Sequence, residues 1–144
     1  MENNFRHRCP LEIRFADMDA LGHVNNAHYL TYFEQARIDY FKTVIGENIN
    51  WAETGLILAH IDIDYKQPLV FGDLVIAYTK CSKIGTKSFE LSYLIVKMTP
   101  GTEVVLATGK SVLVCYDYLK KASILIPEKW KKAMMEYDGM EKSE

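Results

Sequence analysis

The residues whose types and spacing best suit chemistry lie between positions 17 and 26. Two carboxylates, Asp17 and Asp19, precede a glycine, a histidine and an asparagine pair, and an amphipathic segment follows directly. The amino end of a helix offers unpaired backbone N–H groups and a positive dipole end, which suit a carbonyl oxygen that gains negative charge. A carboxylate held nearby can attack the carbonyl carbon or deprotonate a water. The segment therefore predicts an acyl-transfer site.

The other polar residues of this segment have structural as well as functional interpretations. Gly22 either allows a tight turn or lets a substrate approach without a side chain in the way. Asn25 and Asn26 can cap the helix, and capping is compatible with a helix end that polarises a substrate. His23 is as consistent with a hydrogen-bonded structural role as with orienting a carboxylate or lining a pocket. Asp17 is expected to brace the loop rather than perform chemistry.

Apolar periodicity indicates how these residues are positioned. A first strand is expected over 9–15, and a 3.6-residue period predicts a helix over 27–45. Alternating apolar residues then predict further strands over 57–65, 74–84, 89–98 and 104–118, with a hairpin turn at Gly85-Thr86 and a bend at Gly109. A short helix is expected from Pro127 to Glu136, with a frayed tail from about position 138.

These elements predict one α+β domain over residues 1–144, in which an antiparallel sheet of about five strands buries the apolar stripe of one long helix. The last long strand carries apolar residues on both faces, such as Val112 and Val114 against Leu113 and Cys115. One helix covers only one face of a sheet. We therefore expect a homo-oligomer, either a dimer or a tetramer.

Composition excludes several classes of function. Lys and Arg number 17 against 19 Asp and Glu, so a net charge of -2 gives no electrostatic case for nucleic-acid binding. No apolar run is long enough for a membrane span, and the start of the chain has no signal-peptide pattern. Three cysteines without close spacing fit a reducing compartment. The expectation is a cytoplasmic protein.

Few other side chains suggest chemistry. His60 shares one face of its predicted strand with Asp62 and Asp64, but a metal site needs more convergent ligands, so a pocket wall or a subunit contact is favoured. Glu34 and Arg37 are spaced to form an ion pair on the helix. We expect neither a metal nor a cofactor.

The segment from Asp17 to Arg37 resembles the hotdog-fold acyl-CoA thioesterases of the 4-hydroxybenzoyl-CoA thioesterase superfamily. The matching branch carries D-x-D-x-x-G-H-V-N-N followed by Y-x-x-Y-F-E-x-A-R, which this chain has over 17–26 and 29–37. The likeness extends downstream through 61–68, Gly72-Asp73 and Ile126-Pro127. It implies a hotdog fold, in which the sheet wraps around the long helix, and hydrolysis of an acyl-CoA thioester.

Residue by residue, the resemblance implies that Asp19 is the catalytic carboxylate, as nucleophile or as general base. It also implies that the N–H of Asn26 polarises the thioester oxygen. His23, from its place in the motif, is a further candidate catalytic residue. On its own Asp19 would be interpreted as a turn residue that accepts local N–H groups; the whole motif favours catalysis.

Four further residues are expected to contact the substrate: Gly22, Asn25, Tyr29 and His60. The family's dimer places each active site between subunits, so the strand around His60 to Tyr65 is expected to line a partner's pocket. Members that hydrolyse 4-hydroxybenzoyl-CoA carry other residues at positions 23, 25 and 26, which makes that compound a poor substrate expectation.

Three alternatives remain open at this point. The substrate could be a thioester of acyl-carrier protein, or the chain could bind acyl thioesters or act as a scaffold without catalysis, in which case an ionised Asp19 would not be needed. Hotdog hydratases use a paired Asp and His in a different motif, which the spacing of Asp19 and His23 does not reproduce.

Overall fold

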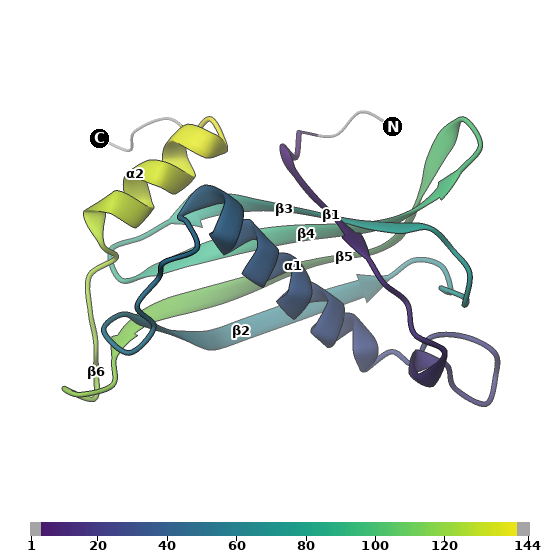
Figure 1. Cartoon of the computed structure of the whole chain (residues 1–144), viewed down its shortest axis with the longest axis horizontal. Coiled ribbons are helices and arrows are strands. Elements are labelled where there is room, and N and C mark those ends of the chain that lie inside the picture. The colour runs from purple at the N-terminus through teal and green to yellow at the C-terminus, as the bar shows by residue number, and fades with distance from the viewer. Residues whose placement is uncertain (1–3, 141–144) are drawn as a thin grey trace.

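The computed structural model describes residues 4–140, which form one antiparallel sheet with a long helix lying across it (Figure 1). A short 3-10 turn, Phe15–Asp17, and a loop separate the first strand from the long helix. The elements in chain order are β1 (His7–Leu11), α1 (His28–Val44), β2 (Gly55–Tyr65), β3 (Val75–Ile84), β4 (Ser88–Thr99), β5 (Thr102–Asp117), β6 (Ala122–Ser123) and α2 (Glu128–Tyr137).

The strand order β1-β3-β4-β5-β2 places the two earliest strands at opposite edges of the sheet. β3, β4 and β5 follow one another as hairpins, and β2 pairs antiparallel with the far side of β5. The two-residue β6 pairs with the end of β5. The predicted α+β fold, with a sheet of about five strands around one long helix, is confirmed.

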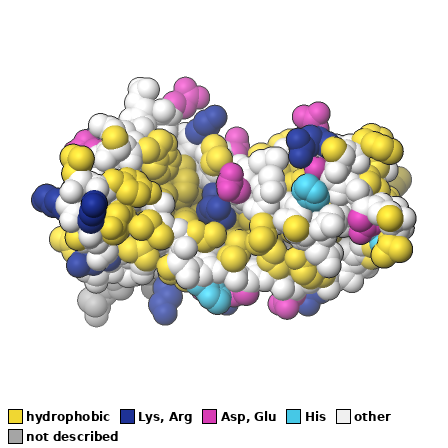
Figure 2. Space-filling model, turned by 90° about the horizontal axis from the view of Figure 1, so that it is seen from below, with side chains coloured by type: hydrophobic (Ala, Val, Ile, Leu, Met, Phe, Trp, Pro, Cys, Tyr) yellow, Lys and Arg dark blue, Asp and Glu magenta, His cyan; other side chains and the backbone are white. Residues whose placement is uncertain are grey.

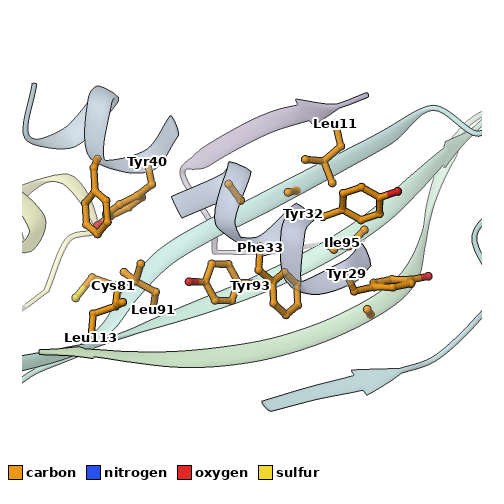
Figure 3. Packing of buried hydrophobic residues seen from close by; sticks show 14 of the residues in the cluster. Leu11, Tyr29, Tyr32, Phe33, Tyr40, Cys81, Leu91, Tyr93, Ile95 and Leu113 are labelled. Carbon is orange, nitrogen blue, oxygen red and sulfur yellow. The ribbon is translucent and has the colours of Figure 1, made fainter. Parts of the chain in front are cut away.

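The buried face of α1 packs mainly against β3 and β1. Its aromatic side chains reach the centre of the sheet, where the Phe33 ring stacks on Tyr93 with centroids 4.5 Å apart (Figure 3). A Cβ at Gly109 would lie 2.5 Å from the Phe33 ring and 2.6 Å from the backbone oxygen of Asp62. Gly109 is therefore needed for the close approach of the helix to β5, in addition to any bend.

A second, smaller apolar cluster lies on the sheet face opposite α1. It joins the middle of β3 and β4 and is packed against by Phe5; its buried members are Ile76, Tyr78, Leu94 and Val96. The start of the described chain thus covers part of this face. Within residues 4–140, neither helix is long and apolar enough to cross a membrane.

One expected boundary was wrong, and the start of the expected frayed tail makes hydrogen bonds. The first strand ends at Leu11, not at Phe15, because Arg14 and Asp17 hydrogen-bond to each other and close the 3-10 turn. The tail was expected to fray from about 138, but the Asp138 carboxylate accepts the N–H of Cys81 at 2.9 Å and the Tyr40 hydroxyl at 2.5 Å. These bonds anchor the end of α2 to β3 and α1; residues 141–144 lie outside the described chain.

Candidate active site

Asp17 is the buried anchor of the loop that precedes α1. Its residue is 1% exposed, and its carboxylate accepts the Tyr32 hydroxyl at 2.7 Å and the Arg14 guanidinium at 3.0 Å. Burial would raise the pKa of this carboxyl group, but the hydrogen bonds from Tyr32 and Arg14 outweigh burial and hold the pKa below its ordinary value. The backbone oxygen of Asp17 also accepts the Asn25 N–H at 2.9 Å. The expected bracing role is confirmed.

Asp19 begins a tight turn closed by backbone hydrogen bonds. Its N–H donates to the oxygen of His23 at 2.7 Å, and the N–H of Gly22 donates to the oxygen of Asp19 at 3.2 Å. Gly22 has φ +84°, and a side chain there would meet open space. Of the two roles considered for Gly22, the structure supports the turn, because only backbone conformation requires glycine here.

The two oxygens of the Asp19 carboxylate differ in their hydrogen bonding. Oδ1 accepts the backbone N–H of Leu21 at 2.9 Å and that of His23 at 3.3 Å. Oδ2 makes no hydrogen bond among residues 4–140. The turn therefore fixes the carboxylate through one oxygen and leaves the other available. Asp19 is both the turn residue that its type suggests and a carboxylate with one free oxygen.

The N-cap residue of α1 is Ala27, which makes no side-chain capping bond; the expected asparagine, Asn25, instead forms the turn that leads into the helix. The side-chain oxygen of Asn25 accepts the N–H of Ala27 at 2.9 Å, and the backbone oxygen of Asn25 accepts the N–H of His28 at 2.9 Å. The hydroxyl of Tyr65, at the end of β2, donates to the oxygen of Asn26 at 3.0 Å. In the described part of the chain, the N–H of Asn26 makes no hydrogen bond. The helix start thus offers one unpaired N–H on a backbone that a neighbouring strand holds in place.

One pocket of about 440 Å³ unites most of the predicted site residues. Those that line it are Asp19, His23, Asn25, Asn26 and Tyr29. Gly22 lies outside the lining and shapes the turn between two residues that do line it. The loop and the first turn of α1 therefore bring these residues together in space, whereas the motif shows only that they are near one another in the sequence.

The wall opposite the loop was not expected from this chain. Tyr65 and the residues after it, Lys66, Gln67 and Pro68, line the same pocket. The Tyr65 ring lies edge-on against Tyr29 with centroids 5.0 Å apart. Burial raises the pKa of Tyr29 to about 12, with Tyr65 and Asp73 adding to the shift, so its hydroxyl stays protonated near neutral pH. Residues 61–68 resemble the family's sequence pattern, which indicated that they matter. That pattern did not predict that they lie beside Asn26.

One expected contact stays a prediction, and another differs from the structure. His60 does not line this pocket; its side chain is 59% exposed, with Nε2 3.1 Å from Asp62, so its place in a partner's pocket stays a prediction. Glu34 and Arg37 form no ion pair, because the Arg37 guanidinium instead donates to the Tyr93 hydroxyl at 3.3 Å. Among residues 4–140, no group of three His, Cys, Asp or Glu side chains is placed to hold a metal ion.

Comparisons with known proteins agree with this architecture. A family model described as the thioesterase-like superfamily matches residues 13–134. The long-chain acyl-CoA thioesterase FadM of Escherichia coli is 29% identical over 110 residues, covering 74% of this chain and 80% of that protein. The uncharacterized protein YsmA of Bacillus subtilis is 37% identical over 87 residues, which are 58% of this chain but only 56% of that relative.

A solved structure extends the likeness over the whole fold. A thioesterase of Thermus thermophilus, described in complex with coenzyme A and Zn, superposes with a TM-score of 0.81 at 28% identity, covering 96% of this chain and 98% of that one. The family model covers far more than half of the sequence, and the fold agrees with it independently. The chain therefore belongs to the thioesterase-like superfamily, as a thioester hydrolase.

Proposed function

We propose that this protein hydrolyses an acyl-CoA thioester to the free acid and CoA in the pocket between Asp19 and the start of α1. One observation carries the proposal: a carboxylate fixed through one oxygen and an unpaired helix-start N–H line the same pocket. A base or nucleophile and an electrophile are what acyl transfer requires. A thioester carbonyl has little resonance stabilisation, so these two groups suffice without a serine, a metal or a cofactor.

In the proposed mechanism, the thioester oxygen accepts the N–H of Asn26 at the positive end of the α1 dipole. Oδ2 of Asp19 then either attacks the carbonyl carbon or removes a proton from a water that attacks it. The first route expels the thiolate and leaves a mixed anhydride that water hydrolyses; the second forms the acid directly. In both routes the C–S bond breaks and the thiolate of CoA leaves and takes up a proton.

The remaining site residues position these two groups. His23 holds Oδ1 of Asp19 with its backbone N–H and is among the residues that line the pocket. Asn25 fixes the helix start, and Tyr29 and Tyr65 form an aromatic wall beside it. Gly22 permits the turn. His60 reaches a substrate only in an oligomer, where a partner's pocket would lie against β2.

The relatives favour CoA over acyl-carrier protein as the thiol. FadM is named for long-chain acyl-CoA, and the Thermus structure holds coenzyme A. Dimeric or tetrameric assembly and a cytoplasmic location stay predictions.

Thiol release from a panel of acyl-CoAs tests the proposal, with Asp19→Asn compared with wild type. We expect kcat to fall at least about hundredfold, since a positioned acid or base typically contributes that much or more. Asn retains an oxygen for the N–H of Leu21, so the turn should persist.

Asp117→Asn is the matched control for this substitution. Asp117 also accepts two backbone N–H groups, those of Leu119 at 2.8 Å and Lys120 at 3.1 Å, but it lies outside the pocket. Its variant should retain wild-type kcat. Equal rates for Asp19→Asn and wild type would remove Asp19 from the mechanism.

The turn geometry of Asp19 also suits a non-catalytic acyl-thioester binding protein, because the carboxylate already has structural partners. Such a protein would bind acyl-CoA in calorimetry with no thiol release at any substrate concentration. Binding and release measured on one preparation separate the two functions.

A further inference from the structure

The end of β2 and the loop after it are bonded to both sides of the catalytic pocket. The Tyr65 hydroxyl donates to the backbone oxygen of Asn26, at the start of α1, at 3.0 Å. Shortly afterwards, the backbone oxygen of Leu69 accepts the N–H of Val24 at 2.8 Å, in the loop that also carries Asp19. One short piece of chain therefore joins the group proposed to polarise the substrate to the loop that holds the proposed base.

Backbone pairing with β5 holds this piece of chain in place. Tyr65 pairs with Ala107, which is fully buried. The next two backbone N–H groups both donate to the oxygen of Leu106, at 2.8 and 3.2 Å. A side chain that is mounted on a paired strand has less freedom than one on a loop. Tyr65 therefore reaches α1 from a fixed backbone.

The first turn of α1 is held loosely by its own backbone. The oxygen of Asn26 accepts the N–H of Tyr29 at 3.2 Å, and the oxygen of Ala27 accepts that of Leu30 at 3.3 Å. These bonds join residues three apart, and their geometry is poorer than that of the bonds in a regular α-helix. A carbonyl oxygen can accept two hydrogen bonds. The Tyr65 hydroxyl is the second donor to Asn26, and it comes from outside the helix.

The ring and the hydroxyl of Tyr65 make separate contacts. The ring lies edge-on against Tyr29, with centroids 5.0 Å apart and planes at 88°. The ring thus forms a wall of the pocket, whereas only the hydroxyl bonds to the backbone of α1. A phenylalanine at position 65 would keep the first contact and lose the second.

We propose that Tyr65 is a positioning residue for hydrolysis: its hydroxyl holds the start of α1 so that the N–H of Asn26 meets the thioester oxygen within reach of Asp19. This proposal rests on the proposed function. Tyr65 acts through the backbone of Asn26 and need not touch the reacting atoms. The N–H contributes most when the oxygen gains negative charge in the transition state, so a misplaced Asn26 lowers kcat more than it raises KM.

The stability of the fold should depend little on this hydroxyl. Tyr65 is 47% exposed. Figure 2, which views the molecule from the β2 side, shows acidic, basic and histidine side chains on the surface of the end where β2 finishes and α1 begins (Figures 1 and 2). Water has access to this end and can replace a lost hydroxyl as a donor to Asn26. An exchanging water satisfies the oxygen, but it does not fix the helix start to β2.

Tyr65→Phe tests the hydroxyl alone. We expect kcat for thiol release from acyl-CoA to fall about tenfold or more, since a misplacement of about 1 Å can cost up to about hundredfold in rate. KM should stay close to the wild-type value, because the aromatic wall remains. The midpoint of urea unfolding should match that of wild type.

Tyr40→Phe is the matched control, because the Tyr40 hydroxyl also joins two elements that are distant in sequence. It donates to the Asp138 carboxylate, just after α2, and Tyr40 lies outside the catalytic pocket. We expect the opposite pattern for this variant, with a lower urea midpoint and the wild-type kcat. A merely structural role for the Tyr65 hydroxyl would give both variants the same pattern.

Amide hydrogen exchange measures the helix start directly. The N–H of Tyr29 bonds to the same oxygen as the Tyr65 hydroxyl, so its exchange should become faster in Tyr65→Phe. The N–H of Ile45, which bonds to Phe41 at the other end of α1, should exchange as in wild type. This pair of amides separates a local loosening of the first turn from a general loss of stability.

Three results would overturn the positioning role while leaving hydrolysis intact. They are a wild-type kcat in Tyr65→Phe, a raised KM as the only change, and a lower kcat with unchanged exchange at Tyr29. Failure of the proposed function looks different, because then wild type would release no thiol or Asp19→Asn would be as fast as wild type.

Discussion

At the scale of single residues, two carboxylates that lie two positions apart have different environments. The Asp17 carboxylate is buried beside Tyr32 and Arg14, and both of its oxygens accept hydrogen bonds from other residues of the fold. Asp19 is partly exposed and keeps one oxygen unbonded in the pocket. A group that supports the fold is saturated with partners, whereas a group that attacks a substrate cannot be. The structure shows the supporting role of the first carboxylate, and the free oxygen of the second is compatible with the proposed chemistry.

Asp17→Asn should destabilise the protein in a pH-dependent way. Loss of charge-assisted hydrogen bonds from a buried site should lower the free energy of unfolding by about 2 to 3 kcal/mol near neutral pH. The folded pKa of Asp17 is below its ordinary 3.8, so this stabilisation is present above that value and is lost as the pH falls through the folded pKa. Urea titrations of wild type and variant should thus converge in strong acid.

Asp64→Asn serves as the control, because Asp64 is exposed and its side chain makes no hydrogen bond among residues 4–140. It should match wild-type stability at every pH. A difference between Asp17→Asn and wild type that stayed constant with pH would show that shape, and not charge, stabilises the loop.

At the scale of elements, the site depends on how closely α1 lies on β5. The contact between the Phe33 ring and Gly109 sets this spacing, since a Cβ would overlap both the ring and the backbone of β2. Because Asn26 lies just before the amino end of α1, a change in spacing would move the N–H proposed to polarise the substrate relative to Asp19.

Gly109→Ala should therefore reduce both stability and catalysis. Overpacking of this kind costs about 1 to 3 kcal/mol, measured as a lower free energy of unfolding by urea denaturation. Phe33→Leu in the same chain should restore part of the loss, and a double-mutant cycle would give a coupling of about 0.5 kcal/mol or more. Additive effects would mean that the two residues do not share the contact.

The same scale shows which features the sequence could predict. Periodicity identified α1 and the long strands because amphipathic spacing is local, and the motif grouped five of the pocket residues. Hydrogen bonds between residues distant in sequence could not be predicted. Arg37 bonds to Tyr93 instead of the nearby Glu34, and Tyr65 reaches back to Asn26. A local pattern predicts on which face of a helix or strand a residue lies, but not which distant residue it contacts.

At the scale of the whole molecule, the two edges of the sheet are not equivalent. β1 carries Pro10, which lacks an N–H and blunts an edge against pairing with another chain. β2 is eleven residues long, pairs within residues 4–140 only with β5, and exposes Ile57 and Leu58. An open, apolar edge of this length favours self-pairing. We therefore expect the predicted homo-oligomer to form through β2.

Ala59→Pro should separate this assembly into single chains. The β2–β5 register shifts between Leu58 and His60, so position 59 lies at an irregularity where a proline need not break the pairing with β5. Sedimentation velocity should give a dimer or tetramer for wild type and mainly monomer for the variant, with unfolding temperatures close together at high protein concentration. A wild type that sediments as a monomer throughout would refute the assembly, and an oligomer untouched by the proline would place its interface away from the β2 edge. If the pocket needs His60 of a neighbouring copy, the monomeric variant should also lose activity in proportion to its dissociation.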